Sequence, residues 1–429
     1  MSDRTILVWF RNDLRLHDNE ILLEATRKAD RILPVYVFDP HYFTATPNGG
    51  HKTGNIRAKF LIESVADLRN NLRAVGSELL IAHGDPAVIL PKLAEQYHVN
   101  EVYHHREVAL EETNISEQVE AALWKIKLNL KHFIGHTLYH KEDLPFPIKD
   151  IPDSFNAFKK KVERDSDVRP SLPLPEHFNT PEITDAGELP TLEQLGLTEP
   201  VSDVRATYSF KGGETTALQQ LDTFFAAKKA SAGGKADRNA AGARISPWLA
   251  LGCISPRQVY WEVVKHEQAT KEHPLMLELL WRDYFRFMFK KYSHKFFDPN
   301  GFRADAPEMA ADQDELFDQW RSGHTGVPFV DATMHELCAT GFISNASRQT
   351  VAAYLVKEMK VDWTRGAQWF EEKLIDYSPA SNWGNWAYIA GVGNDPRENR
   401  YFNPRSAAEL DPKGEYVKTW LPDAERISA

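Results

Sequence analysis

The stretch TILVWFRNDLR, residues Thr5–Arg15, begins with an unbroken run of apolar and β-branched residues. A run this short, followed at once by charged residues, is typical of a strand that is buried on both faces of a parallel sheet. Three later segments have the same character: Arg31–Phe38, Ser77–His83 and Glu101–His104. We predict that these segments and Thr5–Phe10 form the strands of one parallel sheet.

Helical patterns alternate with these strands. Apolar residues recur at helical spacing in Leu61–Leu72, and Asp85 followed by Pro86 is a good helix start. This alternation predicts a doubly wound sheet with right-handed crossovers. The first strand is followed by Arg11–Arg15 where a dinucleotide fingerprint would have glycines, so we do not expect dinucleotide binding of the Rossmann kind.

The chain divides into three segments by composition. Residues 1–134 carry the alternating strand and helix patterns, and prolines become frequent between Gly135 and Arg205. That spacing predicts an extended connector on the surface. After Thr207 the strand signal largely disappears and helical patterns follow. We therefore predict an α/β N-terminal domain (1–134, doubly wound parallel sheet), a proline-rich interdomain connector (135–205) and an all-α C-terminal domain (206–429).

Composition excludes several protein classes. The chain has 429 residues, of which 42% are hydrophobic and 26% charged, and no apolar run approaches the ~20 residues that span a bilayer. The N-terminus has no signal-peptide pattern. Two cysteines, Cys253 and Cys338, exclude a disulfide framework and a cysteine-based zinc cluster. We expect a cytoplasmic monomer with no metal site and no membrane contact.

The net charge of −10 argues weakly against a nucleic-acid partner. Basic residues nevertheless gather at Lys159–Arg164, Arg282–Lys295 and Arg397–Arg405. A local basic face on an acidic protein can still attract a polyanion. For Lys159–Arg164, however, an ordinary solvated surface is the favoured interpretation.

Most of the tryptophans lie after residue 206, where they predict either a packed core or a cofactor cradle. Within the helix expected at Leu275–Tyr292, one face combines Glu278, Trp281, Arg282 and Phe285. The opposite face is apolar as well, so the helix is expected to be buried nearly all round, where unpaired charges are costly. The pattern leaves a structural Glu–Arg ion pair and a ligand site about equally supported.

Two further segments are rich in polar groups. A helix is expected to start at Ser344 and to present Asn345, Arg348 and Gln349 toward one side, where they suit a ring edge or a phosphate. The alternative is a capping asparagine and a solvated arginine. The segment Asp376–Trp386 is a helix end and loop that combines indoles with amides, a composition typical of ligand contacts.

With these segments in view, the chain resembles the photolyase/cryptochrome family along almost its whole length, and most closely the cryptochrome-DASH branch. The motifs are WFRNDLRLHDN (Trp9–Asn19), SPWLALGCISPRQVY (Ser246–Tyr260), ELLWRDYFRFMFKKY (Glu278–Tyr292), TGVPFVDATM (Thr325–Met334), TGFISN and RQ (within Thr340–Gln349) and SNWGNWAYIAGVGNDPREN (Ser381–Asn399).

The resemblance implies a folded, U-shaped FAD in the helical domain and an antenna chromophore near the α/β domain, commonly a folate such as 5,10-methenyltetrahydrofolate. It implies deoxyribodipyrimidine photo-lyase-type activity, in which blue light drives an electron from reduced FAD to a cyclobutane pyrimidine dimer, mainly in single-stranded DNA. The protein then orients the cofactor and sets its electrostatics. A damaged dinucleotide must leave the base stack to reach the flavin, which costs least in a lesion or a single strand.

The resemblance also assigns roles to matching residues. Glu278 would hydrogen-bond the dimer, Trp281 would stack on it, and Arg348 and Asp376 would form a buried pair beside the flavin. The implied catalytic positions are Glu278, Trp281, Asn345, Trp363 and Trp386, the two last being the inner tryptophans of the photoreducing chain. The implied cofactor positions are Arg244, Ile245, Ser246, Arg282, Asn345, Arg348, Asp376, Ser378 and Asn382 for FAD and Glu107 for the antenna. The implied substrate contacts are Glu278, Trp281, Gln349, Tyr388 and Arg400.

The chain also departs from the family pattern. In Ala230–Arg244 the hydroxyls expected at the FAD diphosphate are largely replaced by alanine and glycine, although Arg244 and two other basic residues remain. Ser378 and Ala346 replace an aspartate and an arginine, and no tryptophan lies at Met309–Ala311, where the outermost one of the electron chain is expected. These changes support an alternative: a photoreceptor or binding protein of the same fold with weakened or lost FAD binding and repair.

Overall fold

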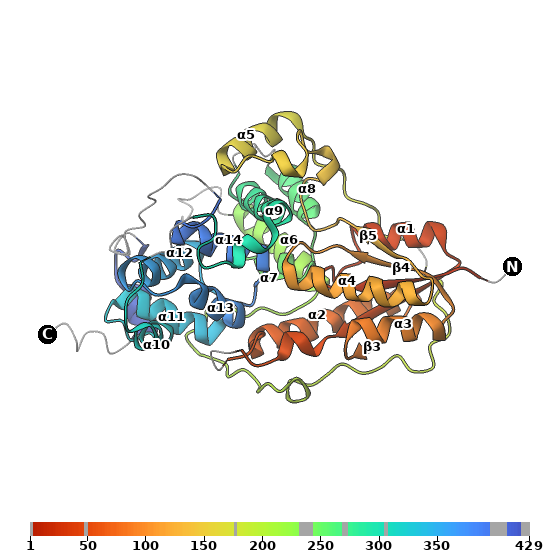
Figure 1. The fold of residues 1–429 in the computed structure, drawn as a ribbon, viewed down its shortest axis with the longest axis horizontal. Coiled ribbons are helices and arrows are strands. Elements are labelled where there is room, and N and C mark those ends of the chain that lie inside the picture. Colours follow the sequence, from red (N-terminus) through yellow and green to blue (C-terminus); the bar gives the residue numbers. More distant parts are fainter. Residues whose placement is uncertain are drawn as a thin grey trace.

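The computed structural model describes residues 3–46, 50–175, 178–230, 243–267, 273–303, 308–394 and 410–421. An α/β part at the N-terminal end adjoins a helical part at the C-terminal end, as Figure 1 shows. None of the described helices is both long enough and apolar enough to cross a membrane.

A five-stranded parallel sheet forms the centre of the α/β part. Its strands are β1 (Thr5–Phe10), β2 (Arg31–Phe38), β3 (Leu80–His83), β4 (Val99–His105) and β5 (Leu130–Phe133). They lie in the order β3-β2-β1-β4-β5, with β1 central and Thr5 beside both Arg31 and Val99. The chain places β2 and β3 on one side of β1 and then β4 and β5 on the other side. This is the doubly wound arrangement that was predicted.

The strand predictions were confirmed with two adjustments and one omission. The bounds of β1 and β2 agree with the prediction, β3 is shorter than Ser77–His83, and β4 is longer than Glu101–His104. The edge strand β5 was not predicted. Its sequence LKHF is half polar, and only its first and last residues are buried, so it lacks the apolar run that marks a central strand.

Four helices cover both faces of the sheet: α1 (Glu20–Lys28), α2 (Asn55–Ala74), α3 (Pro86–Gln96) and α4 (Leu110–Lys125). Alternate side chains of β1 point to opposite faces, so one hydrophobic cluster joins Ile6, Val8 and Phe10 to α1 and α2, while another joins Leu7 and Trp9 to α3 and α4. This is why every residue of β1 is buried. The predicted helix start at Asp85 is confirmed, since its carboxylate caps α3.

The connector is less extended than predicted. It contains an eleven-residue helix, α5 (Phe155–Asp165), which packs against the helical part through Phe155, Phe158 and Val162. These three residues have helical spacing, but the flanking prolines outweighed that signal in the sequence. The segment boundaries at 134/135 and 205/206 remain a prediction, because one continuous hydrophobic cluster includes residues from all three segments.

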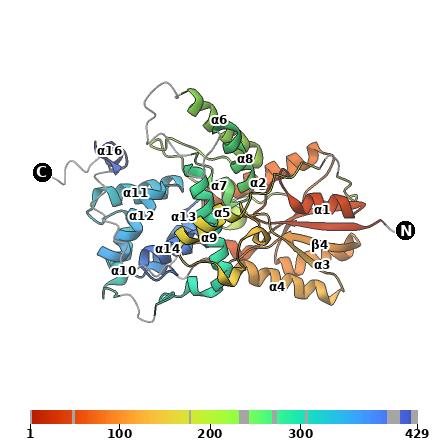
Figure 2. The same ribbon diagram turned by 90° about the horizontal axis from the view of Figure 1, so that it is seen from above.

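The helical part contains the remaining helices, and the described residues after 206 include no strand. Figure 2 shows these helices gathered on the side away from the sheet. They are α6 (Glu214–Ala230), α7 (Ser246–Ala250), α8 (Pro256–Glu267), α9 (Pro274–Tyr292), α10 (Gln313–Ser322), α11 (Pro328–Thr340), α12 (Asn345–Ala353), α13 (Trp363–Lys373), α14 (Pro379–Ala390) and α16 (Glu415–Trp420).

Buried polar bonds join the helical part to the connector and to the α/β part. The carboxylate of Asp283 on α9 accepts backbone N–H bonds from Leu138 and Tyr139, both 2.9 Å long. The carboxylate of Asp18 accepts bonds from Arg257, at 2.6 and 3.0 Å. Because such groups are costly to bury without partners, these bonds fix how α9 faces the end of the sheet.

One buried carboxyl near this junction predicts a pH dependence of stability. Glu112 on α4 is buried, its Oε2 has no hydrogen-bond partner, and burial together with the nearby Glu107 raises its pKa to about 7. A raised folded-state pKa favours folding while the group is protonated, so this contribution is present below the unfolded pKa of ~4.3 and is lost as the pH rises through 7.

We therefore expect Glu112→Gln to reduce the fall in unfolding free energy between pH 5 and pH 8 by an amount on the order of 1–3 kcal/mol. Urea unfolding at both pH values measures it. The control is Glu117→Gln, because Glu117 is exposed on the same helix and should leave the pH dependence unchanged. An unchanged pH dependence in Glu112→Gln would show that the Glu112 carboxyl titrates normally.

Candidate active site

Helix α9 contributes the side chains that the sequence predicted on one face. It starts at Pro274, one residue before the expected start at Leu275, and the ring of His273 accepts the N–H of Leu275. The structure contains no ion pair between Glu278 and Arg282. The Arg282 guanidinium instead donates to the carbonyls of His136 and Leu249. The structural Glu–Arg pair is therefore the wrong alternative for this helix.

Arg282 is a cation without a carboxylate partner of its own. Burial and the neighbouring Arg286 together lower its pKa to about 9, while Asp283 and Glu107 act in the opposite sense. A half-buried cation that donates only to carbonyl oxygens favours an anionic or strongly polar ligand beside it.

Glu278 and Trp281 lie one turn apart on this helix. Solvent reaches Glu278, yet the surrounding protein removes part of its hydration and raises its pKa. Trp281 is half-buried, and its ring meets Tyr388 edge-on at 6.0 Å. An acid and an indole that are both accessible and partly desolvated can hydrogen-bond and stack on a planar ligand.

The connector supplies an aromatic contact that the sequence did not reveal. Phe155, the first residue of α5, stacks on Trp281 with ring centroids 3.6 Å apart and an interplanar angle of 8°. One face of the indole is therefore covered by the protein. A ligand base that stacks on Trp281 must use the other face, beside Phe285, or displace Phe155.

A polar group built on Asp376 joins three elements. Its Oδ2 accepts a bond from Arg348 at 2.8 Å and from the Ser246 hydroxyl at 2.6 Å. Asp376 is buried, so the pair that the resemblance implied is formed. Its Oδ1 has no hydrogen-bond partner in the structure. An unsatisfied buried carboxylate oxygen is costly, and a donor from a bound ligand would satisfy it.

The three amides at this site have different surroundings. Asn382 on α14 is buried and donates to the Ala367 carbonyl at 2.9 Å. Asn345 is exposed, and Gln349 is half-buried. Ser344, not Asn345, caps α12, so the capping alternative for Asn345 is wrong and its amide remains available to a ligand.

The segment leading into α7 is described only from residue 243. Ile245 is buried, and the Arg244 guanidinium lies over the Tyr208 ring at 5.0 Å. Ser378 precedes α14 and forms no side-chain cap bond. The predicted substrate contact Arg400 and most of the altered loop, residues 231–242, lie outside the described residues.

The residues present fit a flavin. An amide-rich ring edge needs both an acceptor and donors from the protein. This site offers Asp376 Oδ1, which has no hydrogen-bond partner, together with the Arg348 guanidinium, the Ser246 hydroxyl and the Asn382 amide. Arg282 adds an uncompensated positive charge. Together they supply what the uracil-like edge of an isoalloxazine and a reduced, anionic flavin require.

Trp386 and Trp363 are both buried, in α14 and at the start of α13. Gly366, one turn after Trp363, lets α13 lie close against Trp386, because a Cβ at this position would lie 2.3 Å from the Trp386 ring. Trp363 itself meets Trp383 edge-on at 5.8 Å. A larger residue at position 366 would therefore have to displace the Trp386 ring.

We expect Gly366→Ala to displace the Trp386 indole and to slow photoreduction of the flavin, with a loss of stability of about 1–3 kcal/mol from overpacking. Flavin absorbance under blue light with an external reductant gives the rate. Gly196→Ala is the stability control, because nothing lies within 4 Å of a Cβ there, although its positive φ makes that substitution strained as well. An unaltered photoreduction rate in Gly366→Ala would contradict the positioning role.

Glu107, the predicted antenna carboxylate, is buried where the loop after β4 meets α9. It accepts bonds from Arg286 at 2.8 Å and Asn12 at 3.0 Å, and its Oε1 lies 3.4 Å from the ring of His136. Burial alone would raise its pKa, but the charges of His136 and Arg286 hold it well below its usual range. Burial also lowers the pKa of His136 well below its ordinary value.

Sequence reasoning missed Phe155, His136, Asn12 and Arg286. Arg286 had a usable signal, because it follows Arg282 by one helical turn on α9. Phe155 and His136 lie in the connector, where no pattern relates them to α9. Among the described residues, no group of three His, Cys, Asp or Glu side chains is arranged to hold a metal ion.

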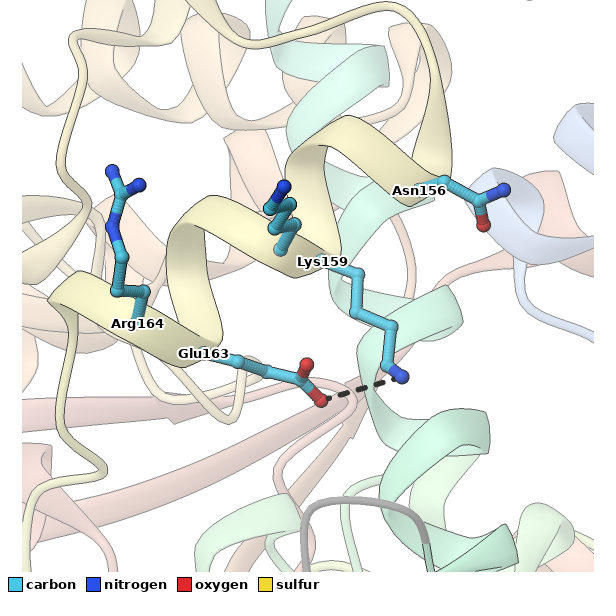
Figure 3. A pocket seen from close by; sticks show the side chains of 5 residues that line it. Asn156, Lys159, Glu163 and Arg164 are labelled. Carbon is cyan, nitrogen blue, oxygen red and sulfur yellow. Dashed lines mark ion pairs between the residues drawn. The ribbon is translucent and has the colours of Figure 1, made fainter.

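The basic segment Lys159–Arg164 forms the exposed side of α5. Side chains of this helix alone line a hollow of about 450 Å³. Figure 3 shows these side chains and the ion pair between Lys159 and Glu163, whose charged atoms lie 3.7 Å apart. A ligand site normally draws polar groups from several elements. Because the lining of this hollow comes from one element, the solvated-surface interpretation is favoured.

The chain is similar to known proteins of one family. Residues 6–180 match the family model described as DNA photolyase, and residues 275–429 match the model described as FAD binding domain of DNA photolyase. A protein named cryptochrome DASH from Gloeobacter violaceus is 46% identical over 99% of this chain and 86% of its own length. A cryptochrome DASH from Danio rerio is 43% identical over 99% of this chain and 84% of its own.

Solved structures of the same family have a similar fold. The cryptochrome of Synechocystis superposes with a TM-score of 0.91 at 42% identity, covering 98% of this chain and 89% of that one. An archaeal photolyase from Sulfolobus tokodaii, described as containing two FAD molecules, gives a TM-score of 0.80 at 27% identity over 99% and 91% of the two chains. The predicted resemblance and fold are thus confirmed.

Proposed function

The chain belongs to the cryptochrome DASH branch of the photolyase/cryptochrome family and has its FAD-binding domain, and from this premise we propose that it repairs cyclobutane pyrimidine dimers in single-stranded DNA under blue light. The observation that carries the proposal is the α9 surface, where the accessible Glu278 and Trp281 lie one turn from the uncompensated cation Arg282. A lesion and an anionic flavin can be held side by side there.

Reduced FAD, excited by blue light, supplies the electron that splits the dimer. The protein's own residues would hold and orient the cofactor and the dimer. Asp376 Oδ1 would accept a hydrogen bond from a donor of the ring edge, and the Arg348 guanidinium holds the Asp376 carboxylate in place. Asn382 and Asn345 present amides to the ring, and Arg282 offsets negative charge on the reduced cofactor.

On the substrate side, Glu278 receives or donates a hydrogen bond at the dimer carbonyls. Burial raises the pKa of Glu278, which favours the protonated, donating form more than in an ordinary glutamate. Trp281 stacks on one base through the face that Phe155 leaves open, with Tyr388 beside it. With the cofactor bound, Gln349 and Arg400 would complete the proposed contacts with DNA, and Trp363 and Trp386 would provide a route for electrons to the flavin.

Single-stranded DNA is the proposed partner because a lesion in it is already unstacked, so the cost of extrusion is small. Stacking on an aromatic side chain contributes about 1–3 kcal/mol per base. No more than two bases of a lesion can use Glu278 and Trp281 at once. Affinity for undamaged DNA should consequently be low.

Glu107 is the proposed anchor of an antenna chromophore, a folate such as 5,10-methenyltetrahydrofolate. The support is a buried carboxylate with a lowered pKa in the lining of a hollow that borders α9. The description of the Sulfolobus tokodaii photolyase names two FAD molecules and a novel light-harvesting cofactor in that protein.

The decisive experiment is repair by the purified, FAD-loaded protein. Oligothymidine containing dimers is illuminated with blue light under reducing conditions, and recovery of absorbance near 260 nm is followed. Loss of one charge-assisted hydrogen bond should make Glu278→Gln about tenfold less efficient. Glu95→Gln, an exposed acid on α3, is the matched control. A wild-type protein that reverses no dimers would overturn the proposal.

One observation favours light sensing without repair. Phe155 covers a face of Trp281, and Met309–Ala311 lacks the outer tryptophan of the electron chain. Under this second hypothesis the protein binds FAD and changes its absorption in light, but dimers persist and Phe155→Ala does not restore repair. The same illuminated samples therefore distinguish the two functions.

A further inference from the structure

The proposed electron path needs an end that solvent can reach. Trp363 is 1% exposed, and the sequence has no tryptophan at Met309–Ala311. An electron that leaves the path for the flavin has to be replaced by a reductant in solution, which cannot reach a buried indole. If the path ended at Trp363, the displaced electron would return to the oxidised indole. The protein therefore needs a further residue that contacts the path and is accessible to solvent.

One aromatic contact of Trp363 continues toward such a residue. Its ring meets that of Trp383 with centroids 5.8 Å apart and an interplanar angle of 78°, across the α13 and α14 helices that Figure 1 shows beside each other. Trp383 is buried, and its Nε1–H donates to the hydroxyl oxygen of Tyr377 at 3.3 Å. Tyr377 precedes α14 and is half-buried. These contacts lead from a buried indole to a phenol that solvent reaches.

Another indole beside the path, that of Trp320, does not offer such an exit. The ring of Trp320 meets that of Trp386 at 6.1 Å. However, Trp320 is completely buried, and its Nε1–H donates to the Val351 carbonyl at 2.9 Å. An electron deficit on Trp320 would remain enclosed by protein, whereas one on Trp383 has Tyr377 as its neighbour.

The surroundings of Tyr377 determine how it can be oxidised. The guanidinium carbon of Arg57, on α2, lies over the Tyr377 ring at 4.7 Å from the centroid. A positive charge at this distance disfavours a second positive charge on the ring. Loss of an electron from Tyr377 is therefore favoured only when the phenolic proton leaves as well. Because the hydroxyl oxygen accepts the Trp383 N–H, its own hydrogen is free to point to another acceptor.

Glu371, on α13, can accept this proton. Burial and then the charge of Glu371 raise the pKa of Tyr377 well above its ordinary value. Burial also raises the pKa of Glu371, whereas the charge of Lys52 and a hydrogen bond from Tyr377 act in the opposite sense. The ammonium of Lys52 lies 3.5 Å from Glu371 Oε1 and favours the ionised carboxylate. A carboxylate held beside a phenol is a general base for the phenolic proton.

We propose that Tyr377 is the terminal electron donor of this protein, with Trp383 as its link to Trp363. The inference rests on the proposed photoreduction through Trp363 and Trp386 and names the residue at which that path ends. Oxidised Trp383 receives one electron from Tyr377, and the phenolic proton passes to Glu371. This leaves a neutral phenoxyl radical and a carboxylic acid. A thiol in solution then donates one hydrogen atom to the phenoxyl oxygen and becomes a thiyl radical, and Glu371 releases its proton to water.

The test identifies the radical on the FAD-loaded, full-length protein. The protein is made with natural or with ring-deuterated tyrosine, illuminated with blue light without reductant, frozen, and measured by electron paramagnetic resonance. Flash absorption at the phenoxyl band gives the rate at which the radical forms. The variants are Tyr377→Phe, Trp383→Phe and Glu371→Gln. The matched control is Tyr260→Phe, because Tyr260 is also half-buried and its ring meets that of a tryptophan, Trp261, at 5.1 Å.

We expect a wild-type signal that narrows with ring-deuterated tyrosine and that is lost in Tyr377→Phe and in Trp383→Phe, while Tyr260→Phe retains it. The signal should form several-fold more slowly in Glu371→Gln, and more slowly in heavy water for the wild type, because a proton leaves together with the electron. With an added thiol, the yield of photoreduction should fall several-fold in Tyr377→Phe.

A wild-type signal that does not respond to deuterated tyrosine would overturn the inference, and so would a tyrosine signal that persists in Tyr377→Phe. Loss of the signal in Trp320→Phe but not in Trp383→Phe would contradict the link through Trp383. Bound FAD is first measured in each variant, and if Tyr377→Phe loses it, Trp383→Phe and the labelled wild type still decide. Dimer repair by the wild type after chemical reduction of FAD is scored separately. Its absence would defeat the proposed function and leave the terminal donor unaffected.

Discussion

Replacing Glu107 with alanine should lower the free energy of unfolding by about 3–5 kcal/mol, the loss expected when one partner of a buried ion pair is removed. Arg286 and Glu107 are both almost fully buried, and their 2.8 Å bond joins α9 to the α/β part. The variant leaves the Arg286 guanidinium and the Asn12 amide without this acceptor. Urea unfolding followed by circular dichroism measures the change.

The matched control restores the balance of charge. In the double variant Glu107→Ala with Arg286→Met, no buried cation is left alone, and we expect most of the lost stability to return. Should the double variant be as unstable as the single one, packing rather than charge would account for the loss. Glu117→Ala, an exposed acid on α4, controls for the substitution itself.

The pH dependence has a definite sign. Burial opposes ionisation of Glu107, but the nearby charges of His136 and Arg286 hold its pKa well below the usual range. A lowered folded-state pKa contributes stability above the unfolded value of ~4.3, and this is lost only as the pH falls through the folded pKa. The difference between wild type and Glu107→Ala should therefore shrink in acid. Between pH 6 and 8 the difference also includes the lower pKa of Glu112 that follows when the Glu107 charge is removed.

The fold was largely predictable because its determinants are local. The strands β1 and β2 are unbroken apolar runs, and Asp85-Pro86 marks the start of α3 whatever the rest of the chain does. The edge strand β5 and the helix α5 were not predictable in this way. β5 is half polar, and the helical spacing of Phe155, Phe158 and Val162 is hidden among prolines.

The candidate site was only partly predictable. Glu278, Trp281 and Arg282 share one helix face, so their spacing brought them together without knowledge of the fold. Three other residues of the site come from separate helices or loops: Arg348, Asp376 and Ser246. Only the family resemblance placed them in one site. The contacts of Phe155 and His136 depend on how the connector docks against α9, which no local pattern encodes.

Arg348→Ala should reduce FAD affinity by roughly a hundredfold or more, corresponding to about 3 kcal/mol, because it leaves the buried Asp376 carboxylate without its cation. Asp376 would then retain the Ser246 hydroxyl as its only side-chain donor. A buried carboxylate without its cation is expected to change position, and it then no longer presents its oxygen to the flavin ring. Flavin absorbance after gel filtration gives the bound fraction.

Two variants separate charge from geometry at this pair. Arg348→Lys keeps the charge but cannot reproduce the guanidinium bonds to both Asp376 and the Ile343 carbonyl, so FAD retention should be intermediate. Arg365→Ala is the control, because Arg365 pairs with the exposed Asp314 at 2.9 Å, where a surface ion pair contributes little. Full FAD retention by Arg348→Ala would mean that Asp376 Oδ1 does not face the flavin, and the orphaned oxygen would then need another donor. The opposite outcome is that Arg348→Ala loses FAD while Arg365→Ala retains it. That result would show that FAD binding depends on Asp376, the buried carboxylate at this site whose Oδ1 has no hydrogen-bond partner within the protein.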